Sequence, residues 1–149
     1  MDTKKVNHQN EKSFSTNRKA ITDKDYFRIM NLVGEDIGKA HVLPESLHKL
    51  YLYAANSKKY KPQRIPQNYV TLNSEIILSN ENDQKQLVKI VLPQNIYEKH
   101  DISVYSLLGL ACIGAKEHDF IYVNYSGTKH KLLIEEIVFQ PEKEKKFNL

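Results

Sequence analysis

The hydrophobic period of the chain changes near Tyr69, and this change limits the folds that the sequence can adopt. Before it, apolar residues recur at helical spacing in two series: Tyr26, Ile29, Met30 and Val33, then Leu47, Leu50, Tyr51 and Ala54. After it, apolar residues alternate along an extended segment: Val70, Leu72, Ile76 and Leu78. Because helices and strands are separated along the chain, we expect an α+β domain in which the helices lie apart from an antiparallel sheet.

The two helical segments are predicted to pair with each other. Thr22 can cap the first segment, which we expect over residues 23–33 with Gly34 as its end. Pro44 suits the first position of the second segment. Two apolar stripes joined by a short connection bury each other most simply as a short antiparallel helix hairpin, here over residues 21–60.

Four strands and one short helix are expected in residues 61–142. The expected strands are residues 70–78, 85–92, 120–125 and 128–139. The last strand carries apolar residues on both sides, so it is predicted to be central and covered on both faces. The short helix is expected to start after Ser106, whose hydroxyl can cap it, and to end before Gly114. Its apolar face predicts a lid that covers the sheet.

Both ends of the chain are polar, which predicts a disordered arm over residues 1–20 and a charged tail over residues 143–149. The single cysteine, Cys112, fits a reducing cytoplasm. No secretory signal is evident, and no apolar run approaches the ~18 residues of a membrane span. We therefore expect a cytoplasmic protein without a membrane partner, present as a monomer or weak oligomer.

No residue pattern in the sequence is typical of catalysis. The six histidines do not follow a metal-binding spacing, and the five glycines match neither the dinucleotide-binding nor the P-loop pattern. We therefore expect no catalytic residue, no bound metal, no cofactor and no enzymatic activity.

Two clusters of charged residues are candidate sites. Glu35 and Asp36 follow the first helix, where two carboxylates can hold a Mg²⁺ that another protein also coordinates; an ordinary polar turn is the alternative. The second cluster is a basic run without an acid, which can contact nucleic-acid phosphates or form a solvated connector. Its members are Lys58, Lys59, Lys61 and Arg64.

The segment from Ser103 to Gly114 reads Ser-Val-Tyr-Ser-Leu-Leu-Gly-Leu-Ala-Cys-Ile-Gly. It resembles the Ser-Val-x-Ser-Pro-x-Gly-x-Ala-x-x-Gly signature of the C-terminal domain of Gre-type transcript cleavage factors. Residues 132–142 resemble the last strand of that domain. Residues 70–74 resemble its opening strand, especially in the regulator of nucleoside diphosphate kinase, a Gre-like protein with a short hairpin.

The resemblance implies an FKBP-like α+β domain that docks on RNA polymerase at the rim of the secondary channel, with the hairpin directed toward the channel. The docking residues it implies are Tyr105, Ser106, Leu107, Leu108 and Gly109. Tyr105 and Leu107 stand where the family has Asp or Asn and Pro. The first helix spans only ~16 Å at ~1.5 Å per residue, so we expect an elongation regulator without transcript cleavage activity.

Two other functions remain open at this point. The protein can be a regulator that binds nucleoside diphosphate kinase or another soluble enzyme, as the short hairpin suggests. Alternatively, it can support Mg²⁺-dependent stimulation of transcript cleavage through Glu35 and Asp36 at the hairpin tip.

Overall fold

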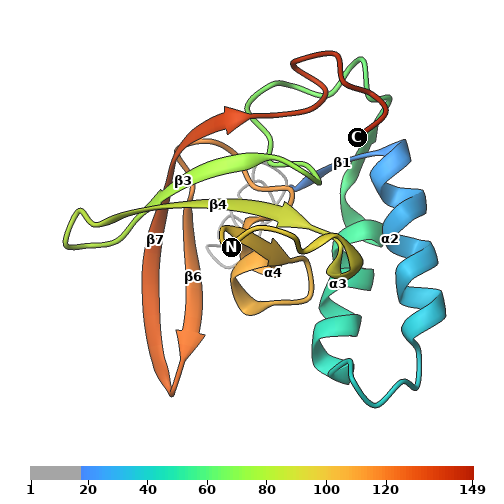
Figure 1. The fold of residues 1–149 in the computed structure, drawn as a ribbon, viewed down its shortest axis with the longest axis horizontal. Coiled ribbons are helices and arrows are strands. Elements are labelled where there is room, and N and C mark those ends of the chain that lie inside the picture. The colour runs from blue at the N-terminus through green and yellow to red at the C-terminus, as the bar shows by residue number, and fades with distance from the viewer. Residues whose placement is uncertain (1–17) are drawn as a thin grey trace, which may run out of the picture.

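A computed structural model of the chain describes residues 18–149. Helices α2 (Asp23–Asp36) and α3 (Pro44–Asn56) stand side by side at one end, and a five-stranded sheet lies at the other (Figure 1). The short helix α4 (Leu107–Cys112) lies between them. The predicted α+β fold is confirmed. Residues 1–17 of the predicted arm lie outside the described residues.

The first helix starts where the sequence predicts and ends later. The Thr22 Oγ1 atom accepts a hydrogen bond from the Asp25 N–H at 3.0 Å, which is the expected cap. The helix continues through Gly34 to Asp36, so the predicted end at Gly34 is wrong. A glycine ends a helix most readily in the left-handed conformation, and here Gly38, with φ of 80°, adopts it instead.

A pair of short parallel strands closes the base of the hairpin. Strand β1 (Ala20–Thr22) pairs with β2 (Lys58–Tyr60), and Ala20 lies opposite Lys58. Ala20 is fully buried. The predicted disordered arm is therefore wrong for residues 18–20, because the backbone of this segment finds partners on β2 and on the Gly114 carbonyl.

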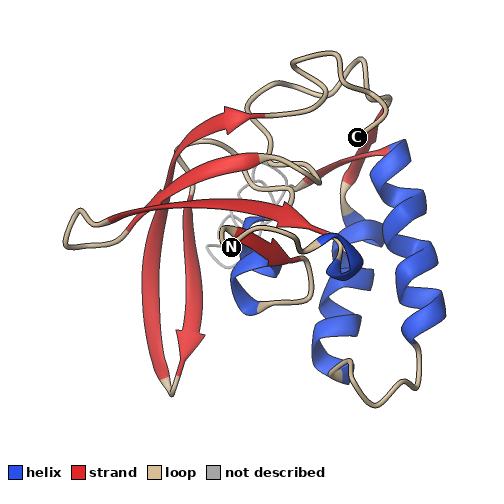
Figure 2. Cartoon of the chain, in the orientation of Figure 1, coloured by secondary structure: helices blue, strands red, loops and turns tan. Residues whose placement is uncertain are grey.

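The five-stranded sheet has the order β5-β4-β3-β7-β6. Neighbouring strands are antiparallel except β5, which runs parallel to β4 at one edge. Figure 2 shows the helices gathered on one side of this sheet. The strands are β3 (Glu75–Ser79), β4 (Lys85–Val91), β5 (Asp101–Ser103), β6 (Phe120–Tyr125) and β7 (Thr128–Phe139), and a 3-10 turn, η1 (Pro93–Asn95), follows β4.

Two strand predictions need correction. Residues 70–74 form turns, with Asn73 at a φ of 69°, so the strand begins only at Glu75. In β7 the register skips Glu135, because Ile77 pairs with Glu136 and Leu78 with Ile134. This bulge turns Ile134 and Ile137 to the same buried face, so β7 is covered on one face and not on two.

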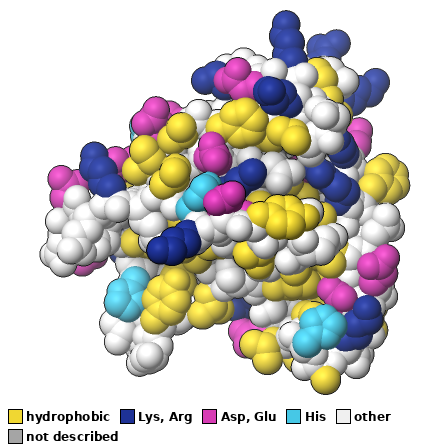
Figure 3. Space-filling view, viewed as in Figure 1, with side chains coloured by type: hydrophobic (Ala, Val, Ile, Leu, Met, Phe, Trp, Pro, Cys, Tyr) yellow, Lys and Arg dark blue, Asp and Glu magenta, His cyan; other side chains and the backbone are white. Residues whose placement is uncertain are grey.

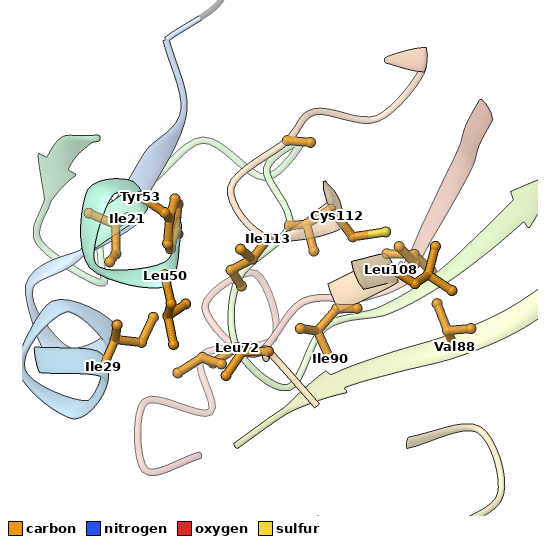
Figure 4. Close-up of a cluster of buried hydrophobic side chains, with 14 of the residues drawn as sticks. Ile21, Ile29, Leu50, Tyr53, Leu72, Val88, Ile90, Leu108, Cys112 and Ile113 are labelled. Carbon is orange, nitrogen blue, oxygen red and sulfur yellow. The ribbon is translucent and has the colours of Figure 1, made fainter. Parts of the chain in front are cut away.

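A continuous hydrophobic core joins the hairpin to the sheet. Figure 4 shows Ile29 and Leu50 of the hairpin on one side and Ile90 of the sheet on the other, with Leu72 and Ile113 between them. All five side chains are essentially inaccessible to solvent. The hairpin therefore packs on the sheet domain through the same core that stabilises the sheet.

The C-terminal segment returns to the start of α2. The Lys24 side chain donates a hydrogen bond to the Phe147 carbonyl, and Gln140 Nε2 donates to the carbonyls of Tyr69 (2.8 Å) and Pro66 (3.1 Å). The predicted charged tail thus contacts the folded body. Among the described residues, no helix combines the length and apolar character needed to span a membrane.

Candidate functional site

The turn before α4 is held by two serines. The Ser106 Oγ–H donates to the Ser103 carbonyl at 2.7 Å, and the same oxygen accepts from the Gly109 N–H at 3.0 Å. The Ser103 Oγ atom accepts from the Tyr105 N–H at 3.1 Å. The predicted cap at Ser106 is confirmed, and Ser103 supplies a second set of contacts. The conformation of the turn is therefore fixed by hydrogen bonds at both ends.

The five predicted docking residues have different exposure. Leu108 and Gly109 are buried, so they shape the turn and do not reach its surface. A Cβ atom at position 109 would lie 2.1 Å from the Ser103 carbonyl oxygen. Only glycine, which has no Cβ atom, therefore fits this close approach. Tyr105 and Ser106 are half-buried, and Leu107 is 47% exposed. A partner can contact these last three.

The hairpin tip and this turn are joined by one hydrogen bond. The Tyr105 hydroxyl donates to the Asp36 Oδ2 atom at 2.9 Å, although the two residues are far apart in the sequence. Asp36 is only 7% exposed, and the Lys39 Nζ atom lies 3.7 Å from its Oδ1 atom. Burial, together with the hydrogen bond and charge of Asp36, raises the pKa of Tyr105, so the hydroxyl keeps its proton and remains a donor.

A cavity of about 360 Å³ lies between the hairpin tip and the turn. Its lining includes Val42, Leu43, Pro93, Tyr105 and Ser106. Leu43 is strongly exposed, as is Ile37, which follows α2. Figure 3 shows apolar side chains at the lower end of the hairpin beside charged ones. The surface therefore combines an apolar pocket with a polar border, as sites for a protein partner often do.

The structure does not bring Glu35 and Asp36 together as a pair of ligands. Consecutive residues on a helix point about 100° apart, so Glu35 faces solvent while Asp36 faces Tyr105. Within residues 18–149, no group of three or more His, Cys, Asp or Glu side chains is placed to hold a metal ion. The predicted acidic tip therefore presents one exposed carboxylate.

The basic run is exposed but divided between two elements. Lys58 and Lys59 lie in β2, where consecutive side chains point to opposite faces, and Lys61 and Arg64 lie in the turn that follows. The Lys59 Nζ atom lies 4.7 Å from the Tyr26 ring centroid. Figure 3 shows basic side chains at the top of the view, over the C-terminal segment and the loop after β2. The run therefore does not form a single basic face.

The contact between Tyr105 and Asp36 was missed by the sequence analysis. Each residue was a candidate on its own, but no periodicity or motif links two residues that meet only through the tertiary fold. The one available signal was the tyrosine itself, because a long side chain with a hydroxyl replaces a short polar residue of the resembled signature.

Comparisons with known proteins find one family model and several solved structures that are similar to this chain. A family model described as "Transcription elongation factor, GreA/GreB, C-term" matches residues 65–139. The solved structure of a transcription elongation factor GreA/GreB from Nitrosomonas europaea is 22% identical, with a TM-score of 0.68, over 82% of this chain and 98% of that one. The GreA factor homolog 1 of Thermus thermophilus is 15% identical, with a TM-score of 0.43, over 82% of this chain and 99% of that one.

The comparison with curated proteins finds no similar sequence. The family model nevertheless covers the sheet domain from before β3 to the end of β7, including the turn before α4. On this match, the chain belongs to the GreA/GreB family of transcription elongation factors.

Proposed function

We propose that the protein docks on RNA polymerase through the turn before α4 and the neighbouring hairpin tip, and that it regulates elongation without stimulating transcript cleavage. The observation that carries the proposal is the hydrogen bond between Tyr105 and Asp36. It fastens the hairpin tip to the turn, so the two surfaces meet a partner as one unit. It also engages one of the two acids that cleavage at the tip would need.

The chemistry of the tip argues against a role in cleavage. A shared Mg²⁺ is usually held by one or two carboxylates from each protein that contributes to the site. Asp36 is buried and bound to Tyr105, which leaves Glu35 as the exposed carboxylate of the predicted pair. Helix α2 has 14 residues, equivalent to ~21 Å at ~1.5 Å per residue, so the hairpin remains short.

Docking can be tested with two leucines of matched exposure. Leu107 in the turn is 47% exposed, and Leu87 on the sheet is 45% exposed. We expect wild-type protein to bind purified core RNA polymerase, and Leu107→Glu to weaken binding at least tenfold because a charge replaces an apolar contact. Leu87→Glu should bind like wild type. Absence of wild-type binding at micromolar concentration, or equal binding by both variants, would contradict the proposal.

Transcript cleavage is a separate measurement. Stalled elongation complexes with Mg²⁺ are expected to show no faster cleavage when wild-type protein is added. Cleavage that is stimulated by wild type and lost in Glu35→Ala would favour the hairpin-tip function instead. Binding to nucleoside diphosphate kinase in place of polymerase, measured with the same leucine variants, would favour a soluble enzyme as the partner.

A further inference from the structure

A groove lies along the outer edge of β6, the edge strand of the five-stranded sheet, and residues of α4 form part of its lining. Two adjoining cavities of about 510 and 560 Å³ form it, and both are lined by Arg18, Lys19, Ala111 and Tyr122. Strand β6 is an edge strand, so no other strand of residues 18–149 pairs with this side. We call this surface, with the neighbouring face of the β6–β7 hairpin, the β6 groove.

Two aromatic rings project from β6 into solvent. Phe120 and Tyr122 occupy alternate positions, so they share a face, and they are 54% and 52% exposed. The Lys131 Nζ atom lies 4.1 Å from the Phe120 ring centroid, and the Lys129 Nζ atom lies 4.4 Å from that of Tyr122. Exposed rings beside lysines are typical of surfaces on which unpaired bases stack while the ammonium groups contact phosphates.

The charges around these rings are mostly positive. Basic side chains that line or flank the groove are Arg18, Lys49, Lys116, Lys129 and Lys131, whereas the Lys19 ammonium donates to the carbonyls of Leu110, Ala111 and Ile113. Asp119 is the one acid among the lining residues and lies in the second cavity, where its Oδ2 atom accepts from the Lys116 N–H at 3.0 Å. Lys49 also pairs with Glu45 at 3.0 Å, outside the lining. A polyanion complements this surface.

The groove has an acidic boundary at its Phe120 end. A neighbouring cavity brings Phe120 and Lys131 close to Glu81, Asp83 and Glu135. Glu135 is paired with Lys85 at 3.1 Å, but the other two acids would repel phosphates. Phosphates are therefore favoured along the β6 edge and at the Tyr122 end of the groove.

The charges and rings together select the occupant. The chain's own residues 1–17 carry Lys4, Lys5 and Lys12 against Asp2 and Glu11, so their charge does not complement a basic groove. Duplex bases are already stacked on each other and cannot lie on the rings. Alternate strand positions are about 6.6 Å apart, which leaves room for one base on each ring.

We propose that the β6 groove binds single-stranded nucleic acid, with bases on Phe120 and Tyr122 and phosphates near Lys116 and Lys129. The proposal is independent of polymerase docking. It places nucleic-acid contact here and not at the basic run of Lys58, Lys59, Lys61 and Arg64, where the structure divides the charges. Leu107 lines one end of the first cavity, so the two proposed surfaces adjoin.

Fluorescence anisotropy with the full chain can test the aromatic contacts. The probes are oligo(U), oligo(dT) and a duplex of equal length, in 50 mM salt. We expect both single strands to bind, the duplex to bind at least tenfold more weakly, and the double substitution Phe120→Ser/Tyr122→Ser to weaken single-strand binding at least tenfold. Phe27→Ser, which removes a 64% exposed ring from α2, is the matched control and should bind like wild type.

The lysines are tested through the salt dependence of the binding constant. This test still applies if circular dichroism shows that the aromatic double variant is unfolded. Each phosphate contact on a single strand contributes a slope of about 0.7 to the fall of log K with log salt. Lys116→Ala/Lys129→Ala should therefore lower the slope by about 1.4, while Lys58→Ala/Lys59→Ala leaves it unchanged.

Several results would overturn the proposal. They are no binding of either oligonucleotide in 50 mM salt, duplex binding as tight as single-strand binding, or a loss confined to the Lys58→Ala/Lys59→Ala variant. Equally tight binding of a poly(Glu) peptide would show general attraction of anions in place of nucleic-acid recognition. A difference between oligo(U) and oligo(dT) would show whether the groove prefers the RNA or the DNA strand. None of these outcomes decides the polymerase-docking proposal, which is tested separately with Leu107→Glu.

Discussion

Helix α2 is attached to the sheet domain at both ends by an aspartate. Asp25 and Asp36 are separated by three helical turns, so both face the domain. At the start of the helix, the Asp25 Oδ2 atom accepts from the Leu72 N–H at 3.1 Å. At its end, the Asp36 Oδ2 atom accepts from the Tyr105 hydroxyl at 2.9 Å. Both aspartates are buried, at 1% and 7% exposure.

The two attachments differ in what they depend on. Asp25 binds a backbone N–H and pairs with Arg28 on its own helix, so its partner on the domain does not change with the side chain at position 72. Asp36 depends on one side chain, Tyr105, in the proposed docking turn. The start of the helix is therefore tied to the fold itself, whereas the hairpin tip is tied to a residue that can vary without loss of the turn.

Removal of Asp25 should have the largest effect on stability. Asp25→Ala leaves the buried Leu72 N–H without its acceptor and takes the ion partner from Arg28, so we expect a loss of about 2–3 kcal/mol, the upper part of the range for an unsatisfied buried donor. Urea unfolding at pH 7 measures this loss. Glu35→Ala, an exposed acid on the same helix, is the control and should change the free energy of unfolding by less than ~0.5 kcal/mol. A loss below ~1 kcal/mol for Asp25→Ala would show that the start of α2 is held by packing alone.

Tyr105→Phe should have a smaller and more local effect. The substitution removes the hydroxyl and leaves a buried carboxylate with the Lys39 ammonium at 3.7 Å, so we expect a loss of about 1–2 kcal/mol. Hydrogen exchange should become faster at the amides of residues 33–36 and stay unchanged near residue 25. Equal acceleration along the whole helix would mean that the two attachments are not separate.

Sequence patterns predicted the features that depend on neighbouring residues. The caps at Thr22 and Ser106, the second helix and the hairpin of β6 and β7 all follow from local periodicity and turn chemistry. The bulge at Glu135 did not, because an alternating pattern gives no sign of a skipped residue. The contact between Asp36 and Tyr105 and the β6 groove join distant segments, and a sequence without aligned relatives carries no record of such contacts.

Glu142 adds a further contact near the start of α2, and its expected effect on stability is the smallest of the three. Its Oε1 atom accepts from the Thr71 hydroxyl at 2.6 Å, next to the loop that binds Asp25. Burial raises the pKa of Glu142, and the charge of Asp25 adds to the rise. The hydrogen bond from Thr71 lowers this pKa, but by less than burial raises it. In the unfolded chain a glutamate titrates near pH 4.3. Between that value and the raised pKa, the folded state holds the proton more tightly, so the contribution of Glu142 to the free energy of unfolding falls as pH increases.

Glu142→Gln keeps an acceptor for Thr71 but cannot titrate. Its free energy of unfolding relative to wild type should therefore increase from about pH 4 upward and become constant above the raised pKa, by less than the loss for Tyr105→Phe. Urea unfolding of both proteins at intervals between pH 4 and pH 8 measures the difference. A difference that decreases as pH rises would mean that the Thr71 hydrogen bond outweighs burial, and that the start of α2 is stabilised by the ionised form of Glu142.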